Sequence, residues 1–463
     1  MRRTARLLAV AGMVAVVAGA PLSGAGAQTS GDWPSYLNNG ARTGFNSAET
    51  VVTPATSPRL HQLWADTAGG SISAEPIQVN GVVYYGSWDG LEHAVDAATG
   101  TQLWSAPLGQ TTVTGCGQPT TGVASTATVG TITLKGVATQ AVFVAGGDSN
   151  FYALNASNGA VIWKVPLGTP PGSFLWSSPL FYKGSIYEGL ASFGDCPLIR
   201  GGIVQLDATT GTVQHTLYTM PSGCLGAGVW GSPAVDSATG DIYFATGNGG
   251  SCSSAAPLAV AVVQTDSSLN LLSSWQVPAS QLTNNDSDFG STPTLFTATI
   301  GGVVHQMVGV QNKNGIYYAF DRSAISRGPL WHKRMSAGGA CPTCGTAGIS
   351  PSAYDGQHLF VGSGKTTVSG VTCAGTIREV QPSNGTAVWT DCLQGPVLGA
   401  VTAVPGVAFV GAGHTVYAVG TSTGAILWSY QDSSGRHFWG AITISNGEVY
   451  AATMGGNLYA FVT

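Results

Sequence analysis

Charged side chains are scarce in this chain. Asp, Glu, Lys and Arg together make up 8% of its 463 residues, whereas they make up about a quarter of an average globular protein. Disorder depends on polar, self-repelling sequence, so this composition argues against it. The chain also has no run of basic residues, which removes the usual electrostatic basis for binding nucleic acid. We therefore expect a folded protein without a nucleic acid partner.

Long apolar runs are missing beyond the N-terminus. Residues 7–20 form an apolar run that follows three arginines and precedes a small-residue motif at residues 25–27, a pattern typical of a secretory signal peptide. A membrane anchor is the alternative, but the run is short for a span of about 20 residues. We predict that residues 1–27 are a signal peptide and that the remainder is secreted, extracytoplasmic and without a membrane span. Its 14 basic and 22 acidic residues leave it a net charge of −8.

Glycine is abundant, with 66 residues, and it recurs inside a repeated unit. The unit has an apolar strand, a second strand that ends in an Asp-x-x-x-Gly turn or a close variant, and a strand that carries Trp. Such a composition is typical of short strands joined by tight turns. A repeat of this kind sets the architecture before any residue is assigned a role. Three clear copies occupy residues 83–104, 142–163 and 407–428.

Eight such units follow one another along the chain. The last unit stops before its Trp strand, and a strand of that type, residues 60–64, precedes the first unit. A ring in which the N-terminal strand completes the last unit explains both observations and leaves no open sheet edge there. We predict an all-β fold over residues 28–463, a single eight-bladed β-propeller domain of four-stranded antiparallel blades; a linear solenoid would need terminal caps. The strand that opens the middle of each unit begins near Val83, Val142, Ile186, Ile242, Val308, Leu359, Val407 and Val449.

The turns and the Trp residues separate two faces of the predicted ring. In a meander, the connections after strands two and four share one face, and the Asp-x-x-x-Gly turns between strands three and four lie on the other. We therefore expect any function on the loops of the first of these faces. A large ring at one place in each blade can fill the wedge between neighbouring blades. We interpret in this way Trp64, Trp104, Trp163, Trp331, Trp389 and Trp428.

The eight cysteines suggest disulfides, because the chain is predicted to be exported. Two pairs bracket matching segments of two repeats, one pair is separated by only two residues, and two cysteines are then left. The predicted disulfides are Cys196–Cys224, Cys373–Cys392, Cys341–Cys344 and Cys116–Cys252. A metal or redox motif is the alternative for residues 341–344, but no second ligand pair follows at zinc spacing.

Polar and aromatic residues gather in loops of the predicted functional face in blades three to five. Asp195, Asn248 and Lys313 follow second strands, and Trp230 and Asp288 open blades four and five. Carboxylate and amide oxygens suit a hard cation such as Ca²⁺. A Lys beside them could hold an anionic cofactor, and an indole ring could stack on a planar one. Each residue could also have a purely structural role, because Asp and Asn commonly stabilise turns.

Five short motifs carry a family resemblance: residues 200–201, 229–233, 245–248, 288–290 and 313–318. With them, the chain from residue 32 onward resembles the quinoprotein alcohol dehydrogenases, especially the polyvinyl alcohol dehydrogenase-like branch. The resemblance implies that Asn248 and Asp288 bind Ca²⁺ and that Asp288 is the catalytic base. It also implies that Lys313 contacts pyrroloquinoline quinone (PQQ) and that Trp230 forms the floor of the cofactor site.

The chain departs from the family pattern at three places. Asp195 stands where the family has a Glu that binds Ca²⁺, and it is one methylene shorter. No two cysteines are adjacent, and no Cys-x-x-Cys-His motif for haem attachment is present. The resemblance therefore implies a separate electron acceptor, with an alcohol or a polymeric alcohol as substrate. We expect the protein to be a monomer.

The resemblance implies a reaction in which Asp288 accepts the hydroxyl proton of the alcohol while hydride moves to the quinone. Ca²⁺ and Lys313 would stabilise the charge that develops on the quinone oxygen. The alternative is a cofactor-free propeller that serves as a binding or assembly scaffold, and the fold alone cannot choose between the two. A hydrolase is supported only by the serine motif at residues 420–424, which falls in a repeat turn and lacks the strand-to-helix turn of a nucleophile elbow.

Overall fold

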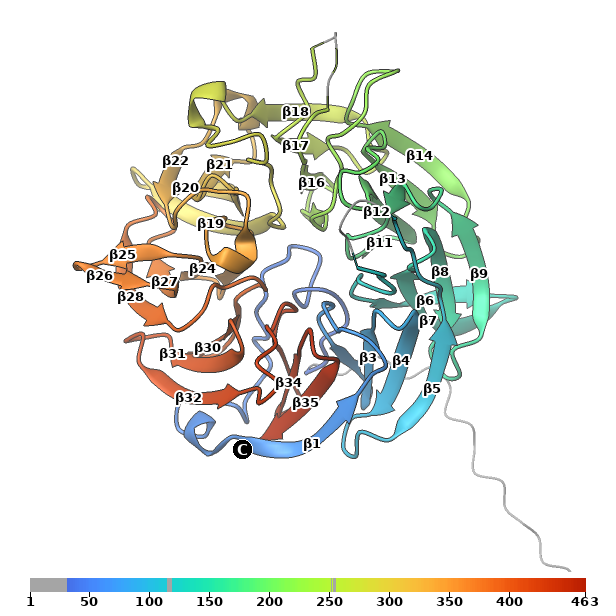
Figure 1. Ribbon diagram of the computed structural model, residues 1–463, viewed down its shortest axis with the longest axis horizontal. Helices are drawn as coiled ribbons and strands as arrows, with labels where there is room; N and C mark the ends of the chain where they lie inside the picture. Colours follow the sequence, from blue (N-terminus) through green and yellow to red (C-terminus); the bar gives the residue numbers. More distant parts are fainter. Residues whose placement is uncertain (1–30, 115–118, 251, 253–254) are drawn as a thin grey trace, which may run out of the picture.

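The computed structural model describes residues 31–114, 119–250, 252 and 255–463. In these residues, eight antiparallel sheets follow one another around a closed ring (Figure 1). The predicted eight-bladed β-propeller of four-stranded blades is therefore confirmed. The predicted signal peptide, residues 1–27, lies outside the described residues.

The first four blades are meanders in which consecutive strands pair. Blade one has β2 (Ile77–Val79), β3 (Val82–Gly86), β4 (Leu91–Asp96) and β5 (Gln102–Pro107), and blade two has β6 (Thr128–Leu134), β7 (Val137–Ala145), β8 (Asn150–Asn155) and β9 (Val161–Pro166). Blade three has β11 (Leu180–Tyr182), β12 (Ser185–Ser192), β13 (Gly202–Asp207) and β14 (Val213–Tyr218), with the short β10 (Ser173–Phe174) added to β12. Blade four has β15 (Ala234–Val235), β16 (Ile242–Ala245), β17 (Ala261–Thr265) and β18 (Leu271–Gln276).

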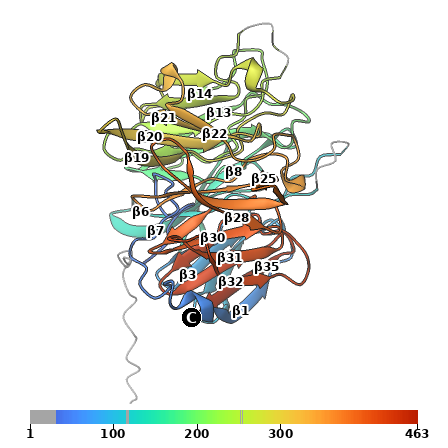
Figure 2. The same cartoon turned by 90° about the vertical axis from the view of Figure 1, so that its left-hand side faces the viewer.

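The other four blades continue the pattern around the ring. Blade five has β19 (Thr294–Ile300), β20 (Val303–Gln311), β21 (Ile316–Asp321) and β22 (Trp331–Arg334), and blade six has β23 (Ala353–Tyr354), β24 (Leu359–Ser363), β27 (Gly375–Val380) and β28 (Ala387–Leu393). Blade seven has β29 (Thr402–Val404), β30 (Val407–Ala412), β31 (Thr415–Gly420) and β32 (Ile426–Gln431), and blade eight has β33 (Thr443–Ser445), β34 (Glu448–Ala452), β35 (Asn457–Val462) and β1 (His61–Thr67). In blade six, the hairpin of β25 (Thr366–Val368) and β26 (Val371–Cys373) projects from the outer rim (Figure 1, Figure 2).

Helical structure in the described residues consists of four single turns of 3₁₀ helix. These are η1 (Ser57–Arg59), η2 (Ala279–Gln281), η3 (Ile325–Arg327) and η4 (Pro342–Cys344). Across the part of the chain that the structure describes, no helix has the length and apolar character that crossing a membrane requires.

The N-terminal strand closes the ring. β1 pairs antiparallel with β35, in a register that runs from His61 opposite Val462 to Thr67 opposite Asn457. Figure 1 shows this blue strand beside the red one. The predicted closure is confirmed, and the closing strand extends beyond the predicted residues 60–64. The free edge of β35 is thereby covered by a fourth strand, as the third strand is in each of the other blades.

The core lies between neighbouring blades. The two middle strands of blade one, β3 and β4, are buried along nearly their whole length, whereas exposed and buried residues alternate along the outermost strand β5. Tyr84 of blade one belongs to the same apolar cluster as Val142 and Val144 of blade two. Each sheet is covered on both faces by its neighbours, so its middle strands are apolar without alternation.

The Trp rings pack against the turn of the following blade. Trp64 Nε1 donates a hydrogen bond of 2.7 Å to the carbonyl oxygen of Ala97, and Trp104 Nε1 donates one of 2.9 Å to that of Ala156. A Cβ atom on Gly100 would lie 2.8 Å from the Trp64 ring, so the turn requires glycine for this approach and for its φ of +70°. The same donation to the next turn is made by Trp163, Trp331 and Trp389.

A segment that sequence analysis left unassigned, residues 31–46, lies in the middle of the ring (Figure 1). Its backbone forms hydrogen bonds with inner-strand residues of blades one, two, four, five, six and seven. Arg42 is fully buried, and its guanidinium donates to the carbonyl oxygens of Pro179 in blade three and Pro233 in blade four. The segment therefore ties the inner strands together around the axis.

Two of the predicted disulfides are wrong. Cys341–Cys344 and Cys373–Cys392 form as predicted, but Cys224 pairs with Cys252, which contradicts both the Cys196–Cys224 and the Cys116–Cys252 predictions. The physical reason is that the loops after β14 and β16 are neighbours on one face, joined by a β-bridge between residues 226 and 249. Cys196 is also disulfide-bonded, and Cys116 lies outside the described residues.

Candidate active site

A cavity of about 530 Å³ opens on one face of the ring, a volume within the range of small-molecule sites. Apart from Tyr36 of the N-terminal segment and the last two residues of β12, its lining comes from two classes of loop. These are the loops that precede the first strand of a blade and those that follow its second strand. The alternation of a meander brings these two classes to the same face, so the cavity lies on the face where function was predicted.

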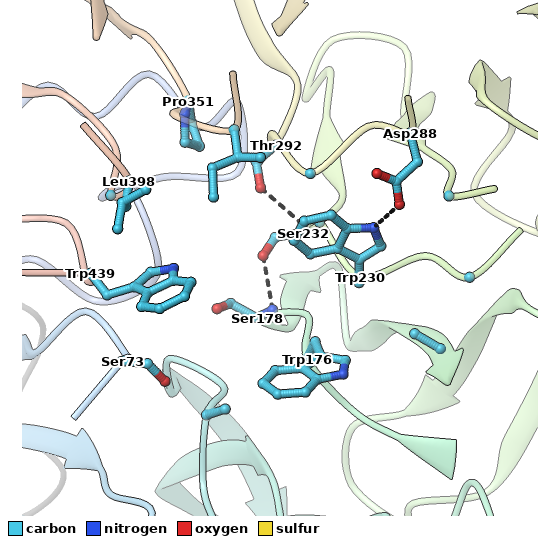
Figure 3. A pocket seen from close by; sticks show the side chains of 18 of the residues that line it. Ser73, Trp176, Ser178, Trp230, Ser232, Asp288, Thr292, Pro351, Leu398 and Trp439 are labelled. Carbon is cyan, nitrogen blue, oxygen red and sulfur yellow. Dashed lines mark hydrogen bonds between the residues drawn. The ribbon is translucent and has the colours of Figure 1, made fainter. Parts of the chain in front are cut away.

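All five residues that the sequence pointed to line this one cavity: Asp195, Trp230, Asn248, Asp288 and Lys313. They come from loops of three consecutive blades. Figure 3 shows Trp230 and Asp288 side by side at one end of the cavity.

Lys313 lies at the centre of a charged cluster. Its Nζ lies 2.8 Å from Asp286 Oδ1 and 2.7 Å from Asp288 Oδ1. The loops that carry these residues are docked by backbone contacts, because Lys313 N donates to the carbonyl oxygen of Asp288 at 3.0 Å. Asn312 Nδ2 donates to the carbonyl oxygen of Ser287 at 2.9 Å. Asp286 was not predicted as a site residue; its signal was its position two residues before Asp288 in the same loop.

Trp230 completes the cluster from the neighbouring blade. Its Nε1 donates a hydrogen bond of 3.1 Å to Asp288 Oδ2, and Lys313 Nζ lies 5.1 Å from the centre of its ring, a cation–π distance. A Cβ atom on Gly290 would lie 2.1 Å from Trp230 Cη2. Glycine at this position therefore lets the indole ring lie beside the Asp288 loop.

The carboxyl groups of Asp288 and Asp195 have raised pKa values. Burial raises the pKa of Asp288 to about 6, although the charge of Lys313 opposes the shift. Burial also raises the pKa of Asp195, again against the charge of Lys313. Burial lowers the pKa of Lys313, but the charges and hydrogen bonds of Asp288 and Asp286 outweigh that effect and raise it overall. Lys313 is thus a firmly charged cation beside a carboxyl group that titrates near neutrality.

Asn248 and Asp195 extend the cluster towards blade three. Asn248 Nδ2 donates to Asp286 Oδ1 at 3.0 Å, and the Asn248 carbonyl oxygen accepts from Ala227 N at 2.6 Å. Asp195 lines the cavity from the loop after β12, with a positive φ of 61°. Within the described residues, no group of three or more His, Cys, Asp or Glu side chains is arranged to hold a metal ion.

A chain of hydroxyl groups that sequence analysis missed joins the blades beside the cavity. Each hydroxyl oxygen accepts a hydrogen bond from a backbone N–H group of the preceding blade. Both the donor and the acceptor residue lie two positions before the first strand of their own blade. Glu75 N donates to Thr126 Oγ1, and Thr126 N to Ser178 Oγ. Ser178 N donates to Ser232 Oγ at 2.8 Å, and Ser232 N to Thr292 Oγ1 at 2.9 Å (Figure 3). The recurring Ser or Thr at this place in blades two to five was the available signal.

The ring of eight four-stranded blades, with a charged cavity built by loops on one face, defines the class of this protein as an eight-bladed β-propeller with a cavity that opens on one face. The chain belongs to the PQQ-repeat family described as outer membrane protein assembly factor BamB, whose model matches residues 89–264 and 312–463.

The chain is also similar to curated quinoprotein dehydrogenases. It is 25% identical to a polyvinylalcohol dehydrogenase of Pseudomonas sp., over 86% of this chain and 69% of the relative. It is 24% identical to the polyvinylalcohol dehydrogenase of Sphingopyxis sp. (strain 113P3), over 87% of this chain and 67% of the relative. The recognised resemblance to quinoprotein alcohol dehydrogenases is confirmed by these matches.

Solved structures agree in fold. The quinohemoprotein alcohol dehydrogenase of Comamonas testosteroni superimposes with a TM-score of 0.72 at 17% identity, over 93% of this chain and 80% of that one. A europium-containing methanol dehydrogenase does so with a TM-score of 0.71 at 17% identity, over 94% and 98% of the two chains. The BamB structure from Moraxella catarrhalis has a TM-score of 0.53 at 14% identity, over 87% and 99%.

Proposed function

We propose that this protein is a PQQ- and Ca²⁺-dependent alcohol dehydrogenase. The observation that carries the proposal is the cluster of Trp230, Asp288 and Lys313 inside one cavity, with Lys313 held by two carboxylates. When bound, PQQ would supply the redox chemistry by accepting a hydride from the alcohol carbon. The names of the similar proteins, polyvinylalcohol dehydrogenase and quinohemoprotein alcohol dehydrogenase, support this reaction class.

Asp288 is the proposed catalytic base. Its carboxyl group is buried and lines the cavity, and its pKa of about 6 leaves it ionised at neutral pH and able to take a proton. A base whose pKa lies near the working pH combines the correct protonation state with a useful affinity for the proton. Trp230 Nε1 and Lys313 Nζ bind the two oxygens of this carboxylate and so orient it towards a hydroxyl group in the cavity.

The cavity residues fit a planar anionic cofactor together with a cation. Among the described residues that line the cavity, Lys313 is the only cation, and it faces the carboxylates of Asp195, Asp286 and Asp288. This excess of carboxylate favours a divalent ion. Asp195, Asn248 and Asp288 would hold the ion, aided by oxygen atoms that arrive with the cofactor. Trp230 would offer a flat face and Lys313 a positive charge to the cofactor.

The proposal also covers the electron acceptor, the substrate, the location of the protein and its domain organisation. A separate electron acceptor would reoxidise the cofactor, and an alcohol or a polymeric alcohol would be the substrate. The disulfides Cys224–Cys252, Cys341–Cys344 and Cys373–Cys392 support an extracytoplasmic location, because such bonds persist in oxidising compartments. Residues 28–463 would act as one propeller domain and as a monomer after removal of the signal peptide.

The test is a reconstitution. The purified protein is titrated with PQQ, with and without Ca²⁺, while cofactor binding is followed by absorbance and turnover by reduction of a dye with primary and secondary alcohols. We expect Ca²⁺-dependent binding and turnover. Asp288→Asn should reduce kcat by about 10²-fold or more while leaving the unfolding midpoint close to that of the wild type.

Two further variants sharpen this test. Lys313→Ala should weaken PQQ binding, because it removes the only cation that the described residues place in the cavity. Asp391→Asn, on the outermost strand β28 of blade six, is the control and should keep both binding and turnover. Absence of PQQ binding in the presence of Ca²⁺ would refute the proposed cofactor, and full activity of Asp288→Asn would refute the proposed base.

The second candidate function is a binding or assembly scaffold. It is favoured by the description of the matched family as an assembly factor and by the fold similarity to a BamB structure. A scaffold has no need of a buried lysine between two carboxylates at the wall of a cavity, so we place it second. A protein that binds neither PQQ nor alcohols would support this candidate.

A further inference from the structure

The cavity wall is charged on one side of the ring and apolar on the other, a part called the apolar half below. Between them, the wall is completed by Tyr36 and by residues of blades one and two: Ser73, Glu75, Trp88, Ala124 and Thr126. Blades three to five supply the charged and amide side chains described above. From blades six to eight, the described residues contribute no charged or hydrogen-bonding side chain except the indole of Trp439. Their lining side chains are Ile349, Pro351, Leu398, Trp439 and Ala441. Figure 3 shows Leu398, Pro351 and Trp439 on the opposite side of the cavity from Asp288.

The repeat explains where this change of character occurs. The position two residues before the first strand carries the hydroxyls of Thr126, Ser178, Ser232 and Thr292 in blades two to five. At the same position, blades six to eight carry Pro351, Ala400 and Ala441. The apolar half is therefore a property of three consecutive blades, built at the same place in each repeat.

The apolar half begins beside the proposed catalytic cluster and is continuous. A Cβ atom on Gly290 would lie 2.1 Å from Trp230 Cη2 and 2.7 Å from Ile349 Cγ2, so Ile349 lies close to the indole edge. On the far side, a Cβ atom on Gly399 would lie 2.7 Å from the carbonyl oxygen of Trp439, so the loop that carries Leu398 rests on the loop of Trp439. Ile349 and Leu398 are almost fully buried, which presents them as a firm wall.

We propose that the cavity selects an alcohol with a single hydroxyl group on an apolar body and discriminates against polyhydroxylated compounds, so that of the two substrates named above it favours the simple alcohol over the polymeric alcohol. This inference rests on the proposed function for the placement of the reacting hydroxyl at Asp288. The body of the substrate then extends over Ile349, Leu398 and Trp439. Each further hydroxyl group buried there without a partner weakens binding by about 5- to 100-fold.

The first test measures binding without turnover. Quenching of tryptophan fluorescence is titrated with 1-propanol, 1-butanol, 1-hexanol and 1-octanol, and with glycerol and sorbitol as polyhydroxylated counterparts. The titrations are made on the protein alone and on the protein with PQQ and Ca²⁺ under anaerobic conditions without a dye. We expect the dissociation constant to fall by about three- to fourfold for each added methylene until the cavity is filled. Sorbitol should bind at least 10-fold more weakly than 1-hexanol.

The second test asks whether the apolar half causes the preference. Leu398→Asn and Trp439→Ser should each reduce the advantage of 1-octanol over 1-butanol by about 10-fold. Leu103→Asn, a change at an exposed leucine on the outermost strand β5, is the matched control and should keep the wild-type preference. Melting curves establish that each variant is folded, and two independent variants guard against a single failure to fold.

The outcomes separate this inference from the proposed function. A dissociation constant that is independent of chain length, tighter binding of sorbitol than of 1-hexanol, or an unchanged preference in both wall variants would overturn the inference. If the chain-length dependence is found but no alcohol is oxidised in the presence of PQQ and Ca²⁺, the dehydrogenase proposal fails while the binding preference stands.

Discussion

At the scale of single residues, burial and charge pairing act against each other on Asp288. Burial raises the pKa of its carboxyl group to about 6, and the charge and hydrogen bond of Lys313, with the Trp230 hydrogen bond, limit the rise. Without these partners the group would hold its proton more strongly still. The residues that touch the carboxylate therefore set the pH at which it becomes a base.

This balance predicts a titration in the protein free of cofactor and metal. Because Trp230 donates to Asp288 Oδ2, protonation of that carboxylate should change the tryptophan fluorescence with a midpoint near pH 6. Asp288→Asn should remove this transition, and Asp391→Asn should keep it. The measurement is a fluorescence titration between pH 4 and 8. An identical transition in Asp288→Asn would show that another group is responsible.

The residues that depart from the repeat could be predicted from the sequence, but the site residues that follow the repeat could not. Asp195, Trp230, Asn248, Asp288 and Lys313 occupy irregular loops, and meander topology alone assigns those loops to one face. Asp286 belongs to the site because its Oδ1 lies 2.8 Å from Lys313 Nζ, and spacing in the sequence does not predict this contact.

At the scale of secondary structure elements, the Trp strand and the glycine turn of the next blade form one packing unit. In blade two, Gly159 has a φ of +70°, and a Cβ atom there would lie 2.6 Å from Trp104 Cε3. Both the backbone conformation and the contact require glycine. The unit explains why Trp and the Gly turn recur together along the sequence.

Paired substitutions can separate these two requirements. Gly136, in the β6–β7 turn, has a φ of +82°, and no atom lies within 4 Å of the position that a Cβ atom would take. Gly136→Ala should therefore lower the free energy of unfolding by about 1–2 kcal/mol. Gly159→Ala adds a clash with Trp104 and should cost about 1–3 kcal/mol more. The measurement is denaturant-induced unfolding of both variants. Equal losses would mean that the Trp ring gives way at little cost.

The disulfides show the limit of reasoning from one blade to another. Cys373–Cys392 joins the inserted hairpin to the outermost strand of blade six, as the bracketing of strand segments predicted. Cys224 lies instead in a loop that is docked on the loop of blade four, through the bridge between Gly226 and Gly249. Its partner is therefore Cys252. Contacts between loops of neighbouring blades depend on how the blades are arranged in the ring, and the repeat pattern of the sequence does not predict them.

At the scale of the whole molecule, the ring is held from both its rim and its centre. β1 closes blade eight at the rim, and residues 31–46 join the inner strands at the centre. Glu75, fully buried at the cavity wall, accepts from Leu37 N at 2.7 Å and so links this central segment to blade one. Burial raises the pKa of Glu75 to about 8, against the Leu37 hydrogen bond and the charge of Arg42.

Glu75 should make the stability of the protein depend on pH. An unfolded Glu ionises near pH 4.3, whereas the folded protein keeps the Glu75 proton up to about pH 8. Between these values the unfolded state binds fewer protons, so the Glu75 contribution to the free energy of unfolding falls as pH rises, by about 1.4 kcal/mol per unit. Glu75→Gln should remove this slope and become more stable relative to wild type from pH 5 to pH 8.

The measurement is denaturant-induced unfolding of both proteins at pH 5, 6.5 and 8. Asp266 offers a control of opposite sign: burial opposes the shift, but hydrogen bonds from Asn270 and Ser268 hold its pKa below the usual value. Asp266 is ionised in both the folded and the unfolded state at pH 5 and above, so Asp266→Asn should lose the same stability at all three pH values and lose less only below about pH 4. Parallel pH profiles for wild type and Glu75→Gln would contradict the assignment.

The repeat by itself determined the ring, the number of blades, the closing strand and the face on which the cavity opens. Each unit contains the strands, turns and Trp of one blade, and the number and order of the units predict how the blades follow one another around the ring. Only the tertiary structure decided the central path of residues 31–46, the pairing of Cys224 with Cys252, the cluster around Lys313 and the apolar half of the cavity. These features are contacts between different blades or between a blade and the central segment, and their energies depend on distances and burial that exist only once the ring is closed.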